Sequence, residues 1–131
     1  IDLSGFLNFA FDSRDLLTLW LVGLPPLGRH LRMQQHAPLA MRVLHQVHLE
    51  PLDRDLMSAM VEHGMKAVGA THTVLADSAR ELLFRASRGV PRVASNLLRR
   101  ALSEAHQRNQ TFIDDHIMEA AIDASPLAQA L

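Results

Sequence analysis

The chain contains no cysteine and no tyrosine, and aromatic residues make up only 5% of its 131 residues. The lack of cysteine excludes disulfide bonds and is typical of a cytoplasmic protein, so we expect a bacterial cytoplasm as its location. No basic segment followed by an apolar one opens the sequence, which argues against a signal peptide. The longest apolar run, residues 19–26, is much shorter than the ~18 residues of a membrane helix, so no membrane span is expected.

Several motifs of catalytic chemistry are also missing. No G-x-x-x-x-G-K-[ST] loop occurs, and no predicted strand ends in the paired acids that hold magnesium. The chain by itself is therefore not expected to hydrolyse ATP or to bind it tightly. The serines show no nucleophile elbow, so a hydrolase triad has no support. His45 and His48 have no cysteine or H-x-x-x-H pair beside them, so no metal site is expected.

The charges nearly balance, with a net charge of −1, but they are segregated along the chain. Residues 29–49 hold three arginines, four histidines and no acid; residues 80–100 hold six arginines and one glutamate; residues 101–131 hold five acids and one arginine. One interpretation is that the acidic last helix neutralises the basic helix before it, and it is favoured for Arg99 and Arg100. The other is that the basic segments line an anion site, and it is favoured for Arg92.

The first part of the chain has the pattern of an α/β fold. Residues 16–22 form an almost continuous apolar run that includes Trp20 and indicates a strand buried on both faces. A second strand is expected at residues 46–50, before Pro51. Two strands cannot hide both faces of a sheet, so residues 1–52 are expected to be the last part of an α/β domain whose first strands precede Ile1. Short helices are expected at residues 3–11, 27–35 and 38–45.

Residues 53–131 are expected to form an all-helical domain, because four amphipathic segments with capping residues follow one another there. Asp53 should cap the first helix, which ends at Gly69. Asp77 or Ser78 should cap the second helix, which ends at Gly89. The third helix should begin at Pro91 and run to about Arg108, and the fourth should follow Thr111 or Asp114. Short loops between such helices are typical of a small bundle.

The junction between the second and third of these helices, residues 87–98, is the most informative segment. Gly89 can adopt the left-handed backbone that closes one helix, and Pro91 suits the first position of the next. Arg92 then falls in the first turn, near exposed N–H groups and the positive end of the helix dipole, where a cation is unfavourable without an anion. The pattern indicates a phosphate site. The alternative is that Arg92 forms a salt bridge or lies in solvent.

The order of these segments resembles the C-terminal half of AAA+ ATPases of the ExeA and TniB/TnsC type, which include secretion ATPases and ATP-dependent regulators of DNA transposition. The resemblance rests on residues 7–9, Asp12-Ser13, residues 17–25, Leu27, Leu39, Arg42, residues 49–52, residues 87–92 and Asn96-Leu97, in this order. The fold that it implies is an α/β remnant, with two strands of a parallel P-loop-type sheet and short helices, followed by a four-helix all-α lid. Such a chain is mostly α overall.

The resemblance also implies roles for individual arginines. Arg42 corresponds to the arginine finger that one subunit offers to ATP in its neighbour. Arg92 corresponds to the sensor 2 arginine of the lid, with Gly89 and Pro91 beside it at the nucleotide.

The sensor 1 region departs from the family's pattern. It corresponds to the strand that ends at Val22, followed by Gly23 and Leu24, where the family usually has glutamine in place of Leu24. Leucine cannot orient a water molecule, so this residue lacks the chemistry that sensor 1 requires.

The function implied by the resemblance is that of the sensor-and-lid portion of an ATPase that couples ATP hydrolysis to DNA transposition. Type II secretion or pilus biogenesis is the alternative setting. ATP and Mg²⁺ would be held by the full-length protein, which is expected to form homo-oligomers and to have DNA and a transposase as partners. A second alternative is a non-catalytic helical module that binds DNA or a protein through Arg85, Arg88, Arg99 and Arg100.

Overall fold

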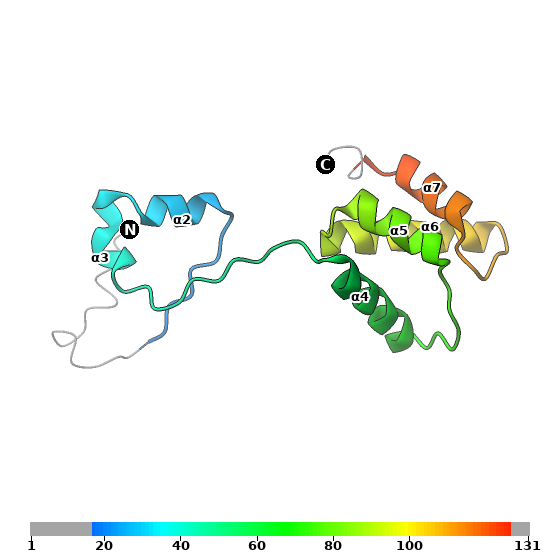
Figure 1. The fold of residues 1–131 in the computed structure, drawn as a ribbon, viewed down its shortest axis with the longest axis horizontal. Coiled ribbons are helices and arrows are strands. Elements are labelled where there is room, and N and C mark those ends of the chain that lie inside the picture. Colours follow the sequence, from blue (N-terminus) through cyan, green and yellow to red (C-terminus); the bar gives the residue numbers. More distant parts are fainter. Residues whose placement is uncertain (1–16, 127–131) are drawn as a thin grey trace. The chain divides into compact units, whose positions relative to one another are not determined.

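The computed structural model describes residues 17–126 and divides the chain into two units, one ending at His48 and the other beginning at Leu49 (Figure 1). The helix expected at residues 3–11 lies outside the described residues.

Within residues 17–48, the first unit forms three short helical segments. They are α2 (Pro26–Leu31), the 3₁₀ helix η2 (Gln34–His36) and α3 (Ala37–Ala40). Both α-helices have a proline in the first turn, where its missing N–H costs nothing. They are shorter than predicted because no residue from 17 to 48 is buried, so no apolar face is packed to extend them.

The two predicted strands are not formed in the described part of the chain. Residues 17–22 and 46–50 contain no strand, and the exposed fraction of Trp20 is 82%, so the prediction that Trp20 is buried is wrong. A strand exists through hydrogen bonds to a neighbouring strand, and an isolated pair is at best marginally stable. The described residues offer neither segment such a neighbour.

In the described part of the second unit, the four predicted helices are formed. They are α4 (Arg54–Ala67), α5 (Asp77–Ser87), α6 (Pro91–Gln107) and α7 (Asp115–Asp123). Asp53 and Asp114 cap α4 and α7, since each carboxylate accepts from a backbone N–H three residues later, at 2.8 and 3.0 Å. The predicted cap of α5 is wrong: Ala76 is the N-cap residue, and no side chain caps this helix.

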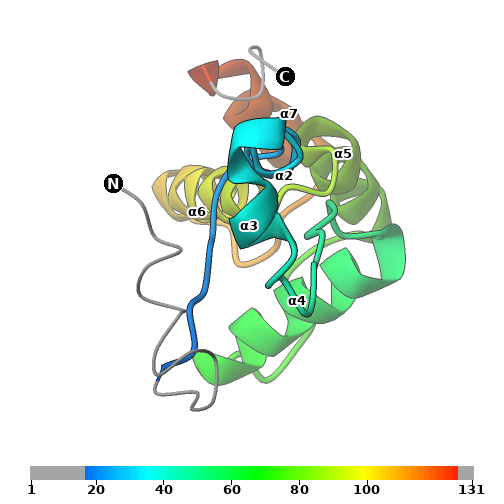
Figure 2. The ribbon, with the colours of Figure 1, turned by 90° about the vertical axis from the view of Figure 1, so that its left-hand side faces the viewer.

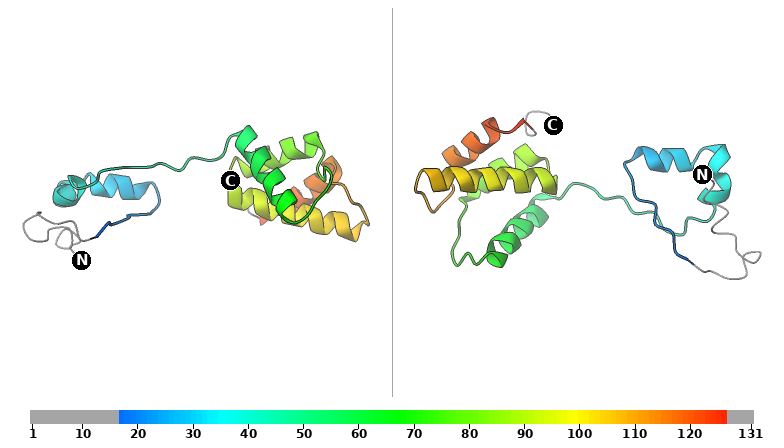
Figure 3. Two further views of the ribbon diagram at one scale, coloured as in Figure 1. Left: turned by 90° about the horizontal axis from the view of Figure 1, so that it is seen from below. Right: turned by 180° about the vertical axis from the view of Figure 1, so that it is seen from behind.

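The core of this unit lies among all four helices. α5, α6 and α7 pack on one another, whereas α4 packs chiefly on α5. α4 and α7 lie on opposite sides of the α5–α6 pair (Figure 2, Figure 3). The buried apolar residues are Met57, Val61, Leu75, Ala79, Leu83, Val93, Ala94, Leu97, Ala101, Ala105, Ile113, Ile117, Met118 and Ala121. Several alanines on α6 let its neighbours approach closely.

A parallel β-bridge between Leu75 and Ile113 joins the loop before α5 to the loop before α7. The N–H of Ile113 donates to the carbonyl of Val74 at 2.7 Å, and the N–H of Ala76 donates to the carbonyl of Ile113 at 3.0 Å. Both bridging side chains are buried. The bridge therefore fixes the starts of α5 and α7 beside each other.

Within residues 17–126, no helix is both long enough and apolar enough to cross a membrane.

Candidate functional site

The backbone reverses between α5 and α6 by two residues with positive φ. Arg88 is the C-cap of α5 with φ 49° and ψ 35°, and Gly89 follows with φ 76°. The N–H of Val90 donates to the carbonyl of Ser87 at 2.9 Å and closes the turn. Gly89 has the predicted left-handed backbone, but that conformation already begins one residue earlier, at the C-cap residue Arg88, and the helix ends at Ser87.

Gly89 is buried because the segment that enters the helical unit lies directly on it. The N–H of Leu52 donates to the carbonyl of Gly89 at 2.8 Å. A Cβ at Gly89 would collide with the carbonyl oxygen of Leu52 and would lie 3.0 Å from the Cβ of Pro51. Two independent features therefore require glycine at position 89: its positive φ, and the close approach of the Leu52 backbone.

The start of α6 carries no side-chain cap. Val90 is the N-cap residue, Pro91 occupies the first turn, and no acidic residue is present there. The first N–H groups of a helix lack partners within the helix, and together with the dipole they favour a bound anion. The predicted helix start at Pro91 is confirmed.

Arg92 lies in this first turn and is exposed. Among the described residues, no hydrogen bond or ion pair joins its side chain to another residue. Of the two alternatives to an anion site, a salt bridge to a neighbouring helix is not formed in the described structure, whereas the exposure of Arg92 to solvent is observed. The positive charge stands beside the positive end of the α6 dipole, an arrangement that an anion would stabilise.

The other arginines of residues 80–100 fall into two groups. Arg80 pairs with Glu62 at 3.2 Å, Arg85 pairs with Glu81 at 2.8 Å, and Arg100 donates to the carbonyl of Ala124 at 2.8 Å. Arg88 and Arg99 are exposed and have no such partner in the described part of the chain. Of the four predicted DNA contacts, only these last two have side chains without a described partner.

The contacts of Arg100 test the prediction that the acidic helix α7 neutralises the basic helix α6. The two helices do pack together, but within residues 17–126 Arg100 donates to a backbone carbonyl at the end of α7 and to no carboxylate. A cation at a helix C-terminus is favourable because it meets the negative end of the dipole.

The remaining predicted site residues belong to the first unit. Arg42 is half-buried in the turn after α3, where its backbone N–H donates to the carbonyl of Leu39 at 3.1 Å. Leu24 is 80% exposed, and its carbonyl accepts from the N–H of Leu27 at 2.9 Å. Gly23 precedes it and approaches the side chain of Leu27 closely. Arg92, Pro91 and Gly89 belong to the second unit.

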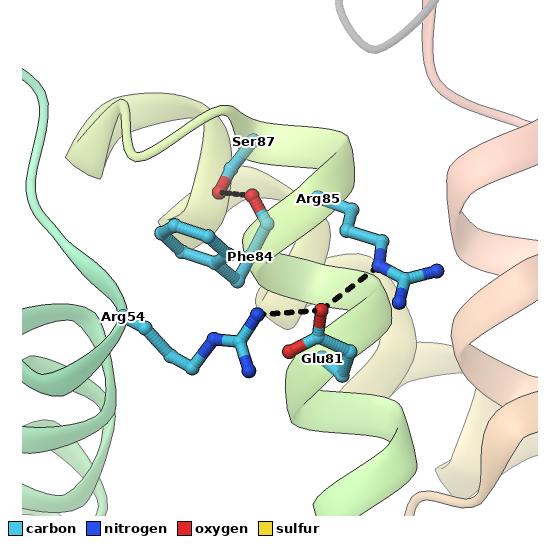
Figure 4. A network of polar contacts seen from close by, with 5 residues as sticks. All are labelled: Arg54, Glu81, Phe84, Arg85 and Ser87. Atoms are coloured by element: carbon cyan, nitrogen blue, oxygen red, sulfur yellow. Dashed lines mark hydrogen bonds and ion pairs between the residues drawn. The ribbon is translucent and has the colours of Figure 1, made fainter.

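A polar network between α4 and α5 was not foreseen from the sequence (Figure 4). Arg54 from α4 pairs with Glu81 of α5 at 3.1 Å, and its guanidinium carbon lies 5.7 Å from the centre of the Phe84 ring. Arg85 shares the same oxygen of Glu81. The Glu81–Arg85 pair could be read from its i,i+4 spacing, but Arg54 is 27 residues away from Glu81 in sequence.

Two shallow hollows flank α4, and neither includes a predicted site residue. One, of about 320 Å³, lies between α4 and the loop before α5 and is lined by Glu62, Lys66, His72 and Arg80, among others. The other, of about 280 Å³, contains the network of Arg54 and Glu81. In the described ranges, no three His, Cys, Asp or Glu side chains are grouped so that they could hold a metal ion.

The chain is similar to general secretion pathway protein A of Aeromonas hydrophila, with 30% identity over 119 residues. The similar region covers 90% of this chain but only 22% of that protein, so the chain spans about a fifth of its relative's length. No family model matches the chain, and no solved structure matches it.

Proposed function

We propose that this chain is the sensor-and-lid portion of an AAA+ ATPase related to general secretion pathway protein A. The observation that carries the proposal is the exposed Arg92, without a described partner, at the uncapped start of α6. The similarity over 90% of the chain supports a secretion setting. It gives no support to DNA transposition, the setting first expected, so secretion takes its place in the proposal.

Arg92 has the chemistry that such a sensor needs. Phosphoryl transfer spreads negative charge over the γ-phosphate oxygens, and a planar guanidinium can meet two of them with parallel hydrogen bonds. The uncapped N–H groups of α6 would add to the attraction. ATP and Mg²⁺ would be held by a P-loop and acidic residues that this sequence does not contain. Arg42 would act on ATP in a neighbouring subunit, so the active protein would be a homo-oligomer.

The test is ATP turnover by the longer protein that carries this chain together with a P-loop. Arg92→Ala should lower turnover by about tenfold or more, since a group that meets the transferred phosphoryl contributes to transition-state stabilisation. Arg42→Ala should lower it by about 10³-fold or more, as for an arginine finger. Arg99→Ala is the matched control, because Arg99 is also an exposed arginine of α6 without a described partner, and turnover should not change.

Equal turnover in wild type and Arg92→Ala would refute the sensor role. A loss of turnover of the same size in Arg99→Ala would show that turnover depends on the overall positive charge of α6 and not on Arg92 in particular.

The second candidate function is binding of DNA or of an acidic protein by the helical unit. It is favoured by Arg88 and Arg99, whose exposed side chains have no partner among the described residues. Arg85 and Arg100, the other two predicted contacts, are held by Glu81 and by the end of α7.

A further inference from the structure

The segment that enters the helical unit is anchored at one residue. Leu49 and Pro51 are exposed, whereas Leu52 is half-buried and packs against the core. Asp53 then caps α4. The anchor consists of the side chain of Leu52 and the hydrogen bond from its N–H to the carbonyl of Gly89.

The other partner in this anchor, Gly89, lies in the turn that leads to Arg92. Its carbonyl accepts from Leu52, and the space that a side chain would need is filled by Leu52 and Pro51. Gly89 is thus held on two sides by the entering segment. Two residues later Pro91 begins α6, and Arg92 follows in the same turn.

We infer that Gly89 is a positioning residue that couples Arg92 to residues 49–52. The inference rests on the proposed nucleotide-sensing role of Arg92. Because the entering backbone and the turn before α6 are in direct contact, a shift of either must move the other or break the contact. A phosphate that binds Arg92 and shifts it therefore also acts on residues 49–52, through Gly89.

Hydrogen–deuterium exchange at the Leu52 amide measures this contact. Gly89→Ala should raise that exchange rate by about tenfold, the expected result of losing one backbone hydrogen bond in a loop. Gly69→Ala is the matched control: Gly69 also has a positive φ, of 87°, but nothing lies within 4 Å of its missing Cβ. It imposes the same kind of backbone strain without the collision, and Leu52 exchange should stay as in wild type.

Pro51→Gly provides a second variant outside the helices, for use if Gly89→Ala fails to fold. It replaces the proline whose fixed φ restricts the backbone just before Leu52, so this backbone gains freedom, and it leaves the helical residues unchanged. It should also raise Leu52 exchange. Unchanged exchange in a folded Gly89→Ala or Pro51→Gly protein would overturn the anchor.

The coupling itself is tested in the longer ATPase with a non-hydrolysable ATP analogue. The analogue should change Leu52 exchange in wild type and in Gly69→Ala, and should not change it in Arg92→Ala. If Arg92→Ala loses turnover while the analogue leaves wild-type Leu52 exchange unaltered, the coupling is wrong and the sensor role stands. If Arg92→Ala keeps full turnover, both the sensor role and the coupling are wrong.

Discussion

Replacing Arg54 with alanine should loosen α4 from α5, because the Arg54 guanidinium makes two contacts with the neighbouring helix. It pairs with Glu81 at 3.1 Å and lies over the ring of Phe84 at 5.7 Å (Figure 4). α4 packs chiefly on α5, so these contacts add to a small apolar interface that includes Met57 and Val61.

The size of the effect follows from the exposure of the groups. The Arg54 side chain is 66% exposed, so the ion pair should contribute only about 0.5 kcal/mol. The contact of this largely exposed guanidinium with the half-buried Phe84 ring contributes about 0.5 kcal/mol more. The free energy of unfolding should therefore fall by about 1 kcal/mol, which lowers the Tm of a helical unit of this size by about 5 °C.

Arg85→Ala is the matched control, because Arg85 pairs with the same oxygen of Glu81 at 2.8 Å but lies on the same helix. It should cost about 0.3 kcal/mol, as for an exposed i,i+4 pair. Urea unfolding followed by circular dichroism gives both values. A double-mutant cycle of Arg54→Ala with Glu81→Gln isolates the ion pair, whose coupling should shrink at about 1 M salt.

Equal losses of stability in Arg54→Ala and Arg85→Ala would refute this reasoning. So would a coupling of zero between Arg54 and Glu81 at low salt. Either result would mean that the ion pair between Arg54 and Glu81 adds no specific stability to the contact of α4 with α5.

Two further predictions concern the helix caps and the exposed arginines. Asp53→Ala and Asp114→Ala should each lower the free energy of unfolding by about 1 kcal/mol, because each removes a capping bond. Asp77→Ala should lower the free energy of unfolding clearly less than these two variants, since Asp77 caps no helix; urea unfolding measures all three. A loss as large as that of Asp53→Ala would contradict the assignment of Ala76 as the N-cap residue of α5. If the helical unit binds DNA, Arg88→Ala combined with Arg99→Ala should reduce the slope of log affinity against log salt by about 1.8 in fluorescence anisotropy, and an unchanged slope would exclude both as phosphate contacts.

The helices could be predicted because their start and stop signals are local. Asp53 and Asp114 cap as expected, Gly69 takes a positive φ after α4, and Pro91 begins α6. The cap of α5 was missed because an aspartate in the first turn of a helix is also favoured by the dipole without capping it. The end of α6 was not foreseen in detail, because Asn109, not a glycine, takes the left-handed backbone there.

Apolar runs alone could not predict whether the two strands form, because strand pairing depends on residues distant in sequence. Residues 17–22 have the composition of a buried strand, yet a strand needs a neighbour, and the described residues provide none. The exposed Trp20 follows from the same absence of cover.

The candidate site, too, could be predicted only in part. The position of Arg92 in the first turn could be predicted from the spacing of Gly89 and Pro91. The contact between Gly89 and Leu52 could not, since the glycine was needed for its φ in any case and the sequence holds no sign of a second reason. The network of Arg54 and Glu81 is likewise a consequence of tertiary packing.

The bridge between Leu75 and Ile113 has a practical consequence for engineering this protein. Residues 71–73 and 110–112 lie before the bridge in their loops, so an inserted epitope or fluorophore there leaves both hydrogen-bonded backbones in register. An insertion between Leu75 and Asp77 would instead shift α5 against α7 and disturb two buried side chains at once. Labels for distance measurements therefore belong at residues 71–73.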